Sequence, residues 1–371
     1  MFKNCHGCLH GVEGYVKMRF RIIISLFFVT ILSYPLSNNS ITSVYEEPED
    51  QKCGRRTILS LDIDPKNPDN IYAGVSTNMS VEFYKSVNNG KNWHIMLRLK
   101  GDNKGTLAIN PYDSQIIYAG RHKSIDGGKT WEPSGLISYL FSYLTIHPVD
   151  KNIVYAITRR DIYRTTGDDK NWFIIKKDCR AFEMDIKKPN ELYAYCGEES
   201  GEGIYKSIDS GVNWERMMHV NNITPAENAA KIMHSPLPKF TIAIDPKDST
   251  IYAAGMKNVY RSTDGGQRWN TIKSDFPDNM RINVLTIDPV HSNRLYIGTN
   301  HGIFKSIDRS FNWRKINNGL PERLFVDFLV VNPRNPNIIY IGTSGSGIFK
   351  SVNGGGSWQP INNGLPCSPP L

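Results

Sequence analysis

Twelve charged side chains in the polar segments of this 371-residue sequence are its strongest candidates for chemistry. Two carboxylates held close together can act as the acid and the base or nucleophile of glycosidic-bond cleavage, and arginines can bind an anionic ligand. Each charge alone is typical of a solvated loop, so the fold must bring them together before they form a site. The candidates are Arg159, Arg160, Asp161, Glu198, Glu199, Glu202, Asp278, Arg281, His301, Glu322, Arg323 and Asp327.

Aspartates also occupy a repeated octapeptide, Ser-x-Asp-x-Gly-x-x-Trp, which ends in more or less complete form at each of the seven tryptophans. Two copies carry Asn88 or Asn353 in place of the aspartate. Asparagine cannot replace a catalytic carboxylate but can accept the same backbone hydrogen bonds, so we interpret the octapeptides as structural turns. The best-preserved positions are Ser124, Asp126, Gly128 and Trp131; Ser207, Asp209 and Trp214; Ser262, Asp264, Gly266 and Trp269; and Ser306, Asp308 and Trp313.

A second motif recurs with the same period of about 44 residues and indicates the architecture. An apolar alternation runs into Asp-Pro, Asn-Pro or His-Pro, as in Leu61–Pro65, and a tyrosine such as Tyr72 follows it. Each unit thus contains four short β-type runs separated by turn residues. We predict an all-β fold, a seven-bladed β-propeller of four-stranded antiparallel blades, with the octapeptides as hairpins between strands three and four. An open β-solenoid is the alternative, although solenoid coils are usually shorter.

The octapeptide resembles the Asp-box, or bacterial neuraminidase repeat, over about 300 residues. This repeat occurs in sialidases, xyloglucan-cleaving glycosidases, sortilin-type receptors and photosystem II assembly-factor propellers. The resemblance implies a β-propeller but no particular reaction. The Phe-Arg-Ile-Pro signature of sialidases is absent, because Phe20-Arg21-Ile22-Ile23 lacks the proline. Xyloglucan-cleaving enzymes resemble two such rings joined across a cleft, whereas this chain supplies one.

Two functional hypotheses follow from the resemblance. The sequence favours a non-catalytic scaffold that binds a protein partner, as an assembly factor does. The alternative is a sialidase-like or xyloglucanase-like glycoside hydrolase, or a propeller that binds a glycan. The sequence has no His-Glu-x-x-His motif, no Gly-x-Ser-x-Gly elbow and no glycine-rich phosphate loop, so we expect no metal and no cofactor.

Loop lengths locate the expected ligand-binding face. In a propeller the turns between strands one and two and the octapeptide turns share one face, and the remaining loops share the opposite funnel face. The twelve charged residues are expected in these funnel-face loops, where a protein partner or glycan would bind. The longest loop, residues 217–239, has a capping box and a proline that predict a short helix over 224–233. This loop either carries function or covers an apolar edge.

The N-terminal segment predicts export. Basic residues precede the apolar run 22–32, which is typical of a signal peptide or anchor, and Met18 is an alternative start. Cys5 and Cys8 form one Cys-x-x-Cys, which is weak evidence for a metal site without a second pair. We expect a secreted, periplasmic or envelope protein that contacts membrane only through an uncleaved N-terminal segment. The expected regions are the extension and signal or anchor (1–36), a flexible tether (37–52) and the propeller (53–371).

Four further cysteines allow two disulfide bridges. Cys179 and Cys196 fall on strands one and two of the fourth unit, so the hairpin should place them together. Cys53 precedes the first unit and Cys367 follows the last, so a bridge between them would lock the closed ring. Both bridges agree with an oxidising compartment.

Composition limits the remaining possibilities. The chain is 22% charged with a mean hydropathy of −0.39, which excludes a polytopic membrane protein and a wholly disordered chain. The net charge of +8 is partly contributed by the signal segment and is too dispersed for a nucleic-acid-binding surface. We therefore expect no binding to nucleic acid. We also expect the protein to be a monomer.

Overall fold

Regular structure in the computed structural model consists of β-strands alone throughout the described residues. Within these residues there is no helix that could span a lipid bilayer. The signal segment, the tether, Cys53, Cys367 and the helix expected over 224–233 lie outside them. The described residues are 56–77, 80–100, 105–135, 143–150, 152–158, 161–165, 171–198, 201–219, 240–272 and 275–366.

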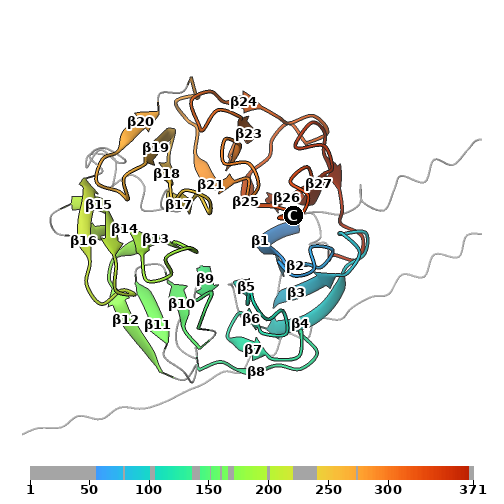
Figure 1. Cartoon of the computed structure of the whole chain (residues 1–371). Helices are drawn as coiled ribbons and strands as arrows, with labels where there is room; N and C mark the ends of the chain where they lie inside the picture. Colours follow the sequence, from blue (N-terminus) through green and yellow to red (C-terminus); the bar gives the residue numbers. More distant parts are fainter. Residues whose placement is uncertain are drawn as a thin grey trace, which may run out of the picture. The chain divides into compact units, whose positions relative to one another are not determined.

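The strands follow one another in antiparallel groups of four, coloured in sequence order around Figure 1. Group one contains β1 (Arg56–Ile63), β2 (Ile71–Ser76), β3 (Ser80–Ser86) and β4 (His94–Lys100); group two contains β5 (Leu107–Ile109), β6 (Ile117–Ala119), β7 (His122–Ser124) and β8 (Glu132–Pro133). Group three contains β9 (Tyr143–Ile146), β10 (Val154–Ile157), β11 (Ile162–Thr165) and β12 (Trp172–Lys176). Group four contains β13 (Cys179–Met184), β14 (Leu192–Glu198), β15 (Gly201–Ser207) and β16 (Glu215–His219).

The second half of the chain repeats the pattern. Group five contains β17 (Phe240–Ile244), β18 (Ile251–Gly255), β19 (Asn258–Ser262) and β20 (Asn270–Ile272). Group six contains β21 (Ile282–Ile287), β22 (Leu295–Thr299), β23 (Gly302–Ser306) and β24 (Arg314–Lys315). Group seven contains β25 (Val326–Val331), β26 (Ile339–Gly345), β27 (Gly347–Ser351) and β28 (Gln359–Pro360).

Strand pairing divides the seven groups of the described residues into six sheets. Groups two to six are separate four-stranded sheets, so the prediction of an all-β fold with four-stranded antiparallel sheets is confirmed. Groups one and seven form one eight-stranded sheet, because Arg56 and Thr57 of β1 pair with Gly345 and Ser344 of β26. The pairing therefore does not confirm seven separate blades, since the first and last groups are continuous where they meet.

The first strands of the groups surround the centre of the ring in Figure 1. Strand β1 contacts β5, β5 contacts β9, and β10 contacts β13. Strands β13, β17, β21 and β25 then contact one another in order, and β25 contacts β1. The succession of contacts returns to its starting point, so the described strands form a closed ring.

Burial is highest in the second strands and lowest at the outer edge of the groups. The second strands β18 and β22 are buried along their whole length, because neighbouring groups cover both faces. The fourth strand β4 is mostly exposed at the outer edge. The core therefore lies between the sheets, where repeated isoleucine, valine, alanine and tyrosine side chains are packed.

The octapeptides form the turns that join third and fourth strands. Ser124 Oγ donates to Asp126 Oδ1 (2.8 Å) and accepts from the Gly128 N–H (2.8 Å). Hydrogen bonds from the side chain and backbone of Thr130 hold the pKa of Asp126 well below its usual range, and the Lys129 N–H adds to them. Gly128 has a φ of 92°, which glycine adopts without a steric penalty. The Asp126 carboxylate is therefore committed to its own turn.

Three octapeptide tryptophans, Trp93, Trp214 and Trp358, donate a hydrogen bond to the preceding group. Trp358 Nε1 donates to the carbonyl of Ile316 at 2.7 Å, between groups seven and six. Trp93 Nε1 donates to the carbonyl of Ile361 at 2.7 Å, between group one and the end of group seven. The Trp93 hydrogen bond therefore closes the ring by the same contact that joins consecutive groups.

Turns between first and second strands depend on a buried side-chain acceptor. Asp64 Oδ1 accepts the backbone N–H groups two and three residues later, at 2.9 and 3.1 Å. In group three the acceptor is His147, whose Nδ1 accepts the N–H groups of Val149 (3.3 Å) and Asp150 (2.9 Å). This arrangement requires a neutral imidazole whose proton is on Nε2.

We expect His147 to reduce the stability of the protein as the pH falls below its ordinary pKa of 6.5. Burial lowers the pKa of His147 in the folded state, so below pH 6.5 the unfolded chain binds the proton more readily. The variant H147N places in this turn the side chain found at Asn110 and Asn332. Urea unfolding between neutral and mildly acidic pH should show a smaller loss of stability in H147N. An equal loss in both proteins would contradict the prediction.

Candidate functional site

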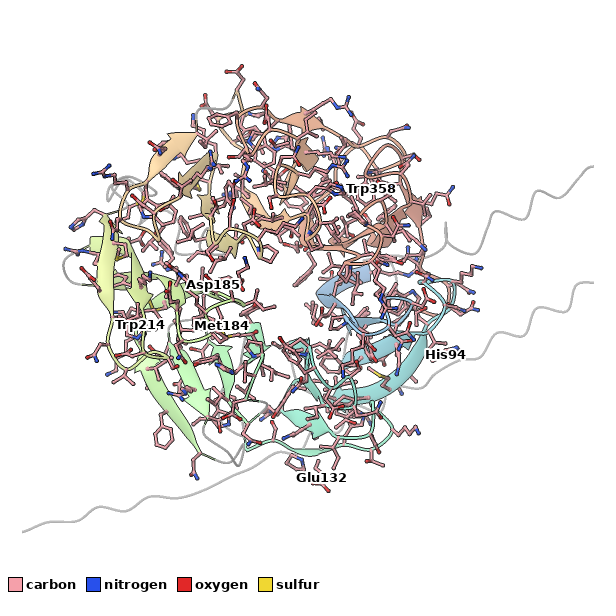
Figure 2. The ribbon with its side chains drawn as sticks, viewed as in Figure 1. His94, Glu132, Met184, Asp185, Trp214 and Trp358 are labelled. Atoms are coloured by element: carbon pink, nitrogen blue, oxygen red, sulfur yellow. A yellow bond between two sulfur atoms is a disulfide. The ribbon has the colours of Figure 1, made fainter. Side chains whose placement is uncertain are left out.

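A pocket of about 430 Å³ is lined by first strands from five groups, β1, β5, β9, β13 and β25. Strands β1 and β13 lie on opposite sides of the central opening in Figure 1. Most lining side chains are apolar, and the titratable ones are Asp62, Tyr143 and Glu183. Figure 2 shows Met184, the residue after Glu183, at the inside of the ring, whereas Glu132 lies at the outer rim. We call this the central pocket.

Asp62 and Glu183 occupy the same position in their repeats. Each pairs across the sheet with the repeated tyrosine of the second strand, Tyr72 or Tyr193. A carboxylate at this enclosed position of an inner strand is energetically costly, and this favours a functional role for the two that occupy it. The other repeats have small or apolar side chains at this position: Ala108, Thr145, Ala243, Thr286 and Val330.

Enclosure by the ring raises the pKa of both carboxyl groups to about 7, chiefly through desolvation. Backbone N–H groups of Ile63 and Ile109 oppose the rise at Asp62, and the Ile63 bond measures 2.8 Å. Glu183 accepts only a longer bond, from the Met184 N–H at 3.4 Å. The two carboxyls therefore titrate in the same range, and they differ in the backbone N–H groups that face their oxygens. Both side chains remain partly exposed, so a ligand in the pocket can reach them.

Tyr143 adds a hydrogen-bond donor to the same pocket. The side chain lines the pocket and keeps 39% of its surface exposed. Enclosure and the negative charges of Glu183 and Asp62 hold its pKa well above the usual range, and a hydrogen bond with Thr145 only partly opposes this. The hydroxyl therefore stays protonated and can donate to a polar ligand.

These three side chains suit general acid–base chemistry. A carboxyl that keeps its proton at neutral pH can act as an acid, and a neighbouring ionised carboxylate can act as a base or nucleophile. Apolar walls with a few polar groups are typical of small-ligand and saccharide pockets. In the described part of the chain, no cluster of three or more His, Cys, Asp or Glu side chains is suited to a metal ion.

Those of the twelve predicted ligand-binding residues that the structure describes are spread over loops and strand ends of groups three to seven. None of those that the structure describes lines the central pocket. Glu322 and Arg323 are exposed before β25. Their role in binding stays a prediction. Arg159, Arg160, Glu199 and the side chain of Glu198 lie outside the described residues.

Most of the other predicted binding residues form hydrogen bonds or ion pairs with nearby residues. Arg281 and His301 share a partner, since the Arg281 N–H and His301 Nδ1 lie 2.7 and 3.0 Å from Asn300 Oδ1. The structure therefore brings these two predicted residues together. Three others have separate partners: Asp161 accepts from the Asp178 N–H, Asp278 pairs with Lys257, and Asp327 accepts from the Ser344 hydroxyl.

Glu202 stabilises the hairpin of group four. It forms an ion pair with Arg180 at 2.7 Å and accepts a hydrogen bond from the Tyr195 hydroxyl.

Cys179 and Cys196 form a disulfide between β13 and β14, with a Cα–Cα distance of 3.9 Å. This predicted bridge is therefore present.

Sequence reasoning missed Asp62, Glu183 and Tyr143 because it looked for chemistry in the loops. The signal for the two carboxylates lies in the repeat itself. Asp62 lies between the apolar residues Leu61 and Ile63, at a position where other repeats have alanine, threonine or valine instead of a carboxylate. Aligning the repeats by the tyrosine of the second strand would have identified both carboxylates.

Comparison with curated proteins identifies xyloglucanases as relatives, although no protein-family model matches the chain. A xyloglucanase from a Paenibacillus species is 29% identical over 213 residues, which is 53% of this chain and 20% of the relative. Xyloglucanase Xgh74A of Acetivibrio thermocellus is 23% identical over 215 residues, 45% of this chain and 25% of the relative. The chain thus matches a quarter or less of the length of these proteins.

Solved structures with a similar fold support a β-propeller. An ancestral GH74 enzyme has a TM-score of 0.63 at 17% identity and covers 84% of this chain and 47% of its own. YCF48 bound to a D1 peptide has a TM-score of 0.58 at 14% identity and covers 81% of this chain and 94% of its own. At such identities the likeness establishes the fold alone.

The curated relatives correct the function that the sequence favoured. A non-catalytic, protein-binding scaffold is contradicted, because the matching curated proteins are xyloglucanases. The same matches agree with the prediction that an enzyme of this type would be a glycoside hydrolase. The sequence argument had disfavoured a hydrolase because the Phe-Arg-Ile-Pro signature of sialidases is absent and because the chain supplies a single ring.

Proposed function

We propose that this protein hydrolyses glycosidic bonds in a xyloglucan-type β-glucan, with Asp62 and Glu183 as its carboxylate pair. One observation carries the proposal: two carboxyl groups with a pKa of about 7 line the same pocket from different sides of the ring. The xyloglucanase relatives support the glycan class.

The environments of the two carboxyls suggest their roles. Glu183, with the weaker support for its ionised form, is the general acid that protonates the leaving oxygen. Asp62, which accepts backbone N–H groups, is the base or nucleophile. The Tyr143 hydroxyl positions the substrate by donating a hydrogen bond.

The proposal includes a finer architecture and a location. We infer seven blades with Asp-box hairpins, in which groups one and seven are two blades that meet at the ring closure. The seven tryptophan-ended octapeptides support this count. An exported protein is supported by the Cys179–Cys196 disulfide, which persists in oxidising compartments.

Release of reducing ends from tamarind xyloglucan tests the function. One carboxyl must be protonated while the other is ionised, and both titrate near pH 7, so the rate should peak near pH 7 and fall on both sides. Starch, whose linkages are α, is the control and should stay intact. If no reducing ends form at any pH, hydrolysis of xyloglucan is contradicted. Binding of xyloglucan without cleavage would instead indicate a glycan-binding propeller.

A further inference from the structure

A second pocket, of about 520 Å³, lies between groups five and six and shares no lining residue with the central pocket. We call it the rim pocket. Its volume is within the range of about 300–1,000 Å³ that is usual for small-ligand sites. Aromatic and polar side chains line it together: Phe276, Phe304, Phe311 and Trp313, with Lys257, Asn258, Thr271, Asp275 and Asn312.

The indole of Trp313 differs from those of other octapeptide tryptophans. Trp269 Nε1 donates to the carbonyl of Gly266 at 2.9 Å, and Trp358 Nε1 donates to that of Ile316 at 2.7 Å. Trp313 Nε1 is buried, yet no described residue accepts its hydrogen. A buried N–H group without an acceptor lowers the stability of the fold, because the loss of its hydration is not compensated. An acceptor on a bound ligand would remove this cost.

The sixth octapeptide also differs from the others in one side chain. Ser310 stands at the position of Gly128 and Gly266 and has a φ of 75°, which is unfavourable for a residue with a Cβ atom. Its buried hydroxyl Oγ has no hydrogen-bond partner among the described residues. The positive φ itself is common to the octapeptide turns, since Gly128 and Gly266 have φ values of 92° and 94°, but there the residue is glycine. The Cβ atom and the unpaired hydroxyl of Ser310 are therefore local costs, and they fall in the residue before Phe311 of the rim pocket.

The aromatic side chains of the rim pocket are fixed by their neighbours. The ring of Phe276 lies 5.4 Å from that of Phe304 in an edge-to-face arrangement and 6.1 Å from that of Trp313. Phe311 is 58% exposed, and the guanidinium of Arg261 lies 5.7 Å from the centre of its ring. The pocket therefore has a rigid aromatic wall with one exposed ring at its edge.

We infer that the rim pocket binds a pyranose ring of a neutral β-glucan, as a binding site separate from the catalytic pair. A pyranose has an apolar C–H face, which can stack on Phe311, and hydroxyl oxygens that can accept from Trp313 Nε1. Asn258, Asp275 and other polar lining groups can bond to the remaining hydroxyls. A purely apolar ligand would leave the indole N–H without an acceptor. The choice of a β-glucan as the ligand rests on the proposed function. The evidence that the rim pocket is a binding site does not depend on that function.

Titration of the tryptophan indole signals tests this inference. The protein is labelled with ¹⁵N-tryptophan in the E183Q background, so that the probe, xyloglucan heptasaccharide, is not consumed. The Trp313 signal, assigned by its loss in W313F, should move as its N–H gains an acceptor. The F311A variant should weaken this binding about tenfold or more, which corresponds to about 1.4 kcal/mol.

Matched controls separate the site from general effects. F173A removes another exposed aromatic ring, 55% exposed on β12, and should leave the titration unchanged. W269F removes the equivalent indole in group five, which is already hydrogen-bonded, and should also leave it unchanged. If the chemical shift of the Trp313 indole does not change at millimolar heptasaccharide, or changes equally in F311A, the inference is wrong. Failure of hydrolysis in the wild-type protein would overturn the proposed function but leave this binding result intact.

Discussion

The variants D62N and E183Q should each lower the rate of xyloglucan hydrolysis by about a thousandfold. Each substitution replaces a carboxyl of the central pocket with an amide that can neither donate an acidic proton nor act as a base. The measurement is the initial rate of reducing-end release at pH 7, where both carboxyls are half protonated. E132Q, in an exposed residue at the outer rim, is the matched control and should keep the wild-type rate.

The same two variants should be more stable than the wild-type protein in mildly alkaline solution. The pKa of each carboxyl is raised to about 7 by folding, so the folded state loses stability as the pH rises through this range. Amides avoid this cost, and we expect a gain of about 1 kcal/mol per site in the free energy of unfolding. Loss of activity together with loss of stability would contradict the assignment, because it would indicate a structural role.

The variant W93A should lower the free energy of unfolding by about 3–5 kcal/mol. Trp93 is 3% exposed, and its indole N–H bonds to the Ile361 carbonyl at 2.7 Å across the junction of the first and last groups. The substitution leaves both a cavity and an unpaired carbonyl at the point where the ring closes. Equilibrium unfolding in urea measures the effect.

Exposed aromatic residues provide the control for the ring-closure variant. F173A removes a ring that is 55% exposed on the outer strand β12, so its stability should stay within about 0.5 kcal/mol of the wild type. A loss in W93A no larger than that in F173A would contradict the account of ring closure. W358A, at the equivalent contact with Ile316, should behave as W93A does.

Much of the fold could be predicted from the sequence because the repeat is local. The spacing from Ser124 to Trp131 indicates a turn in which the serine and aspartate side chains bond within eight residues, and the structure contains those bonds. The Cys179–Cys196 bridge was predictable because hairpin pairing alone brings the two residues together. The join between groups one and seven was not, because it depends on where the distant Thr57 and Ser344 meet.

The central pocket could not be found by searching the loops, since its carboxyls come from strands far apart in the sequence. Asp62 and Glu183 line one pocket only because the closed ring brings the first strands of groups one and four around the same central space. Their raised pKa is likewise a property of the assembled ring, since desolvation by surrounding strands causes it. The rim pocket depends in the same way on the packing of group six against group five.

A crystal structure of E183Q with xyloglucan heptasaccharide tests the central claim most directly. We expect a glycosidic oxygen beside the substituted side chain at position 183, with the Asp62 carboxylate near the adjacent anomeric carbon. The Tyr143 hydroxyl should contact the same sugar. A central pocket without sugar, while the oligosaccharide binds elsewhere on the protein, would contradict the claim that these two carboxyls perform the reaction.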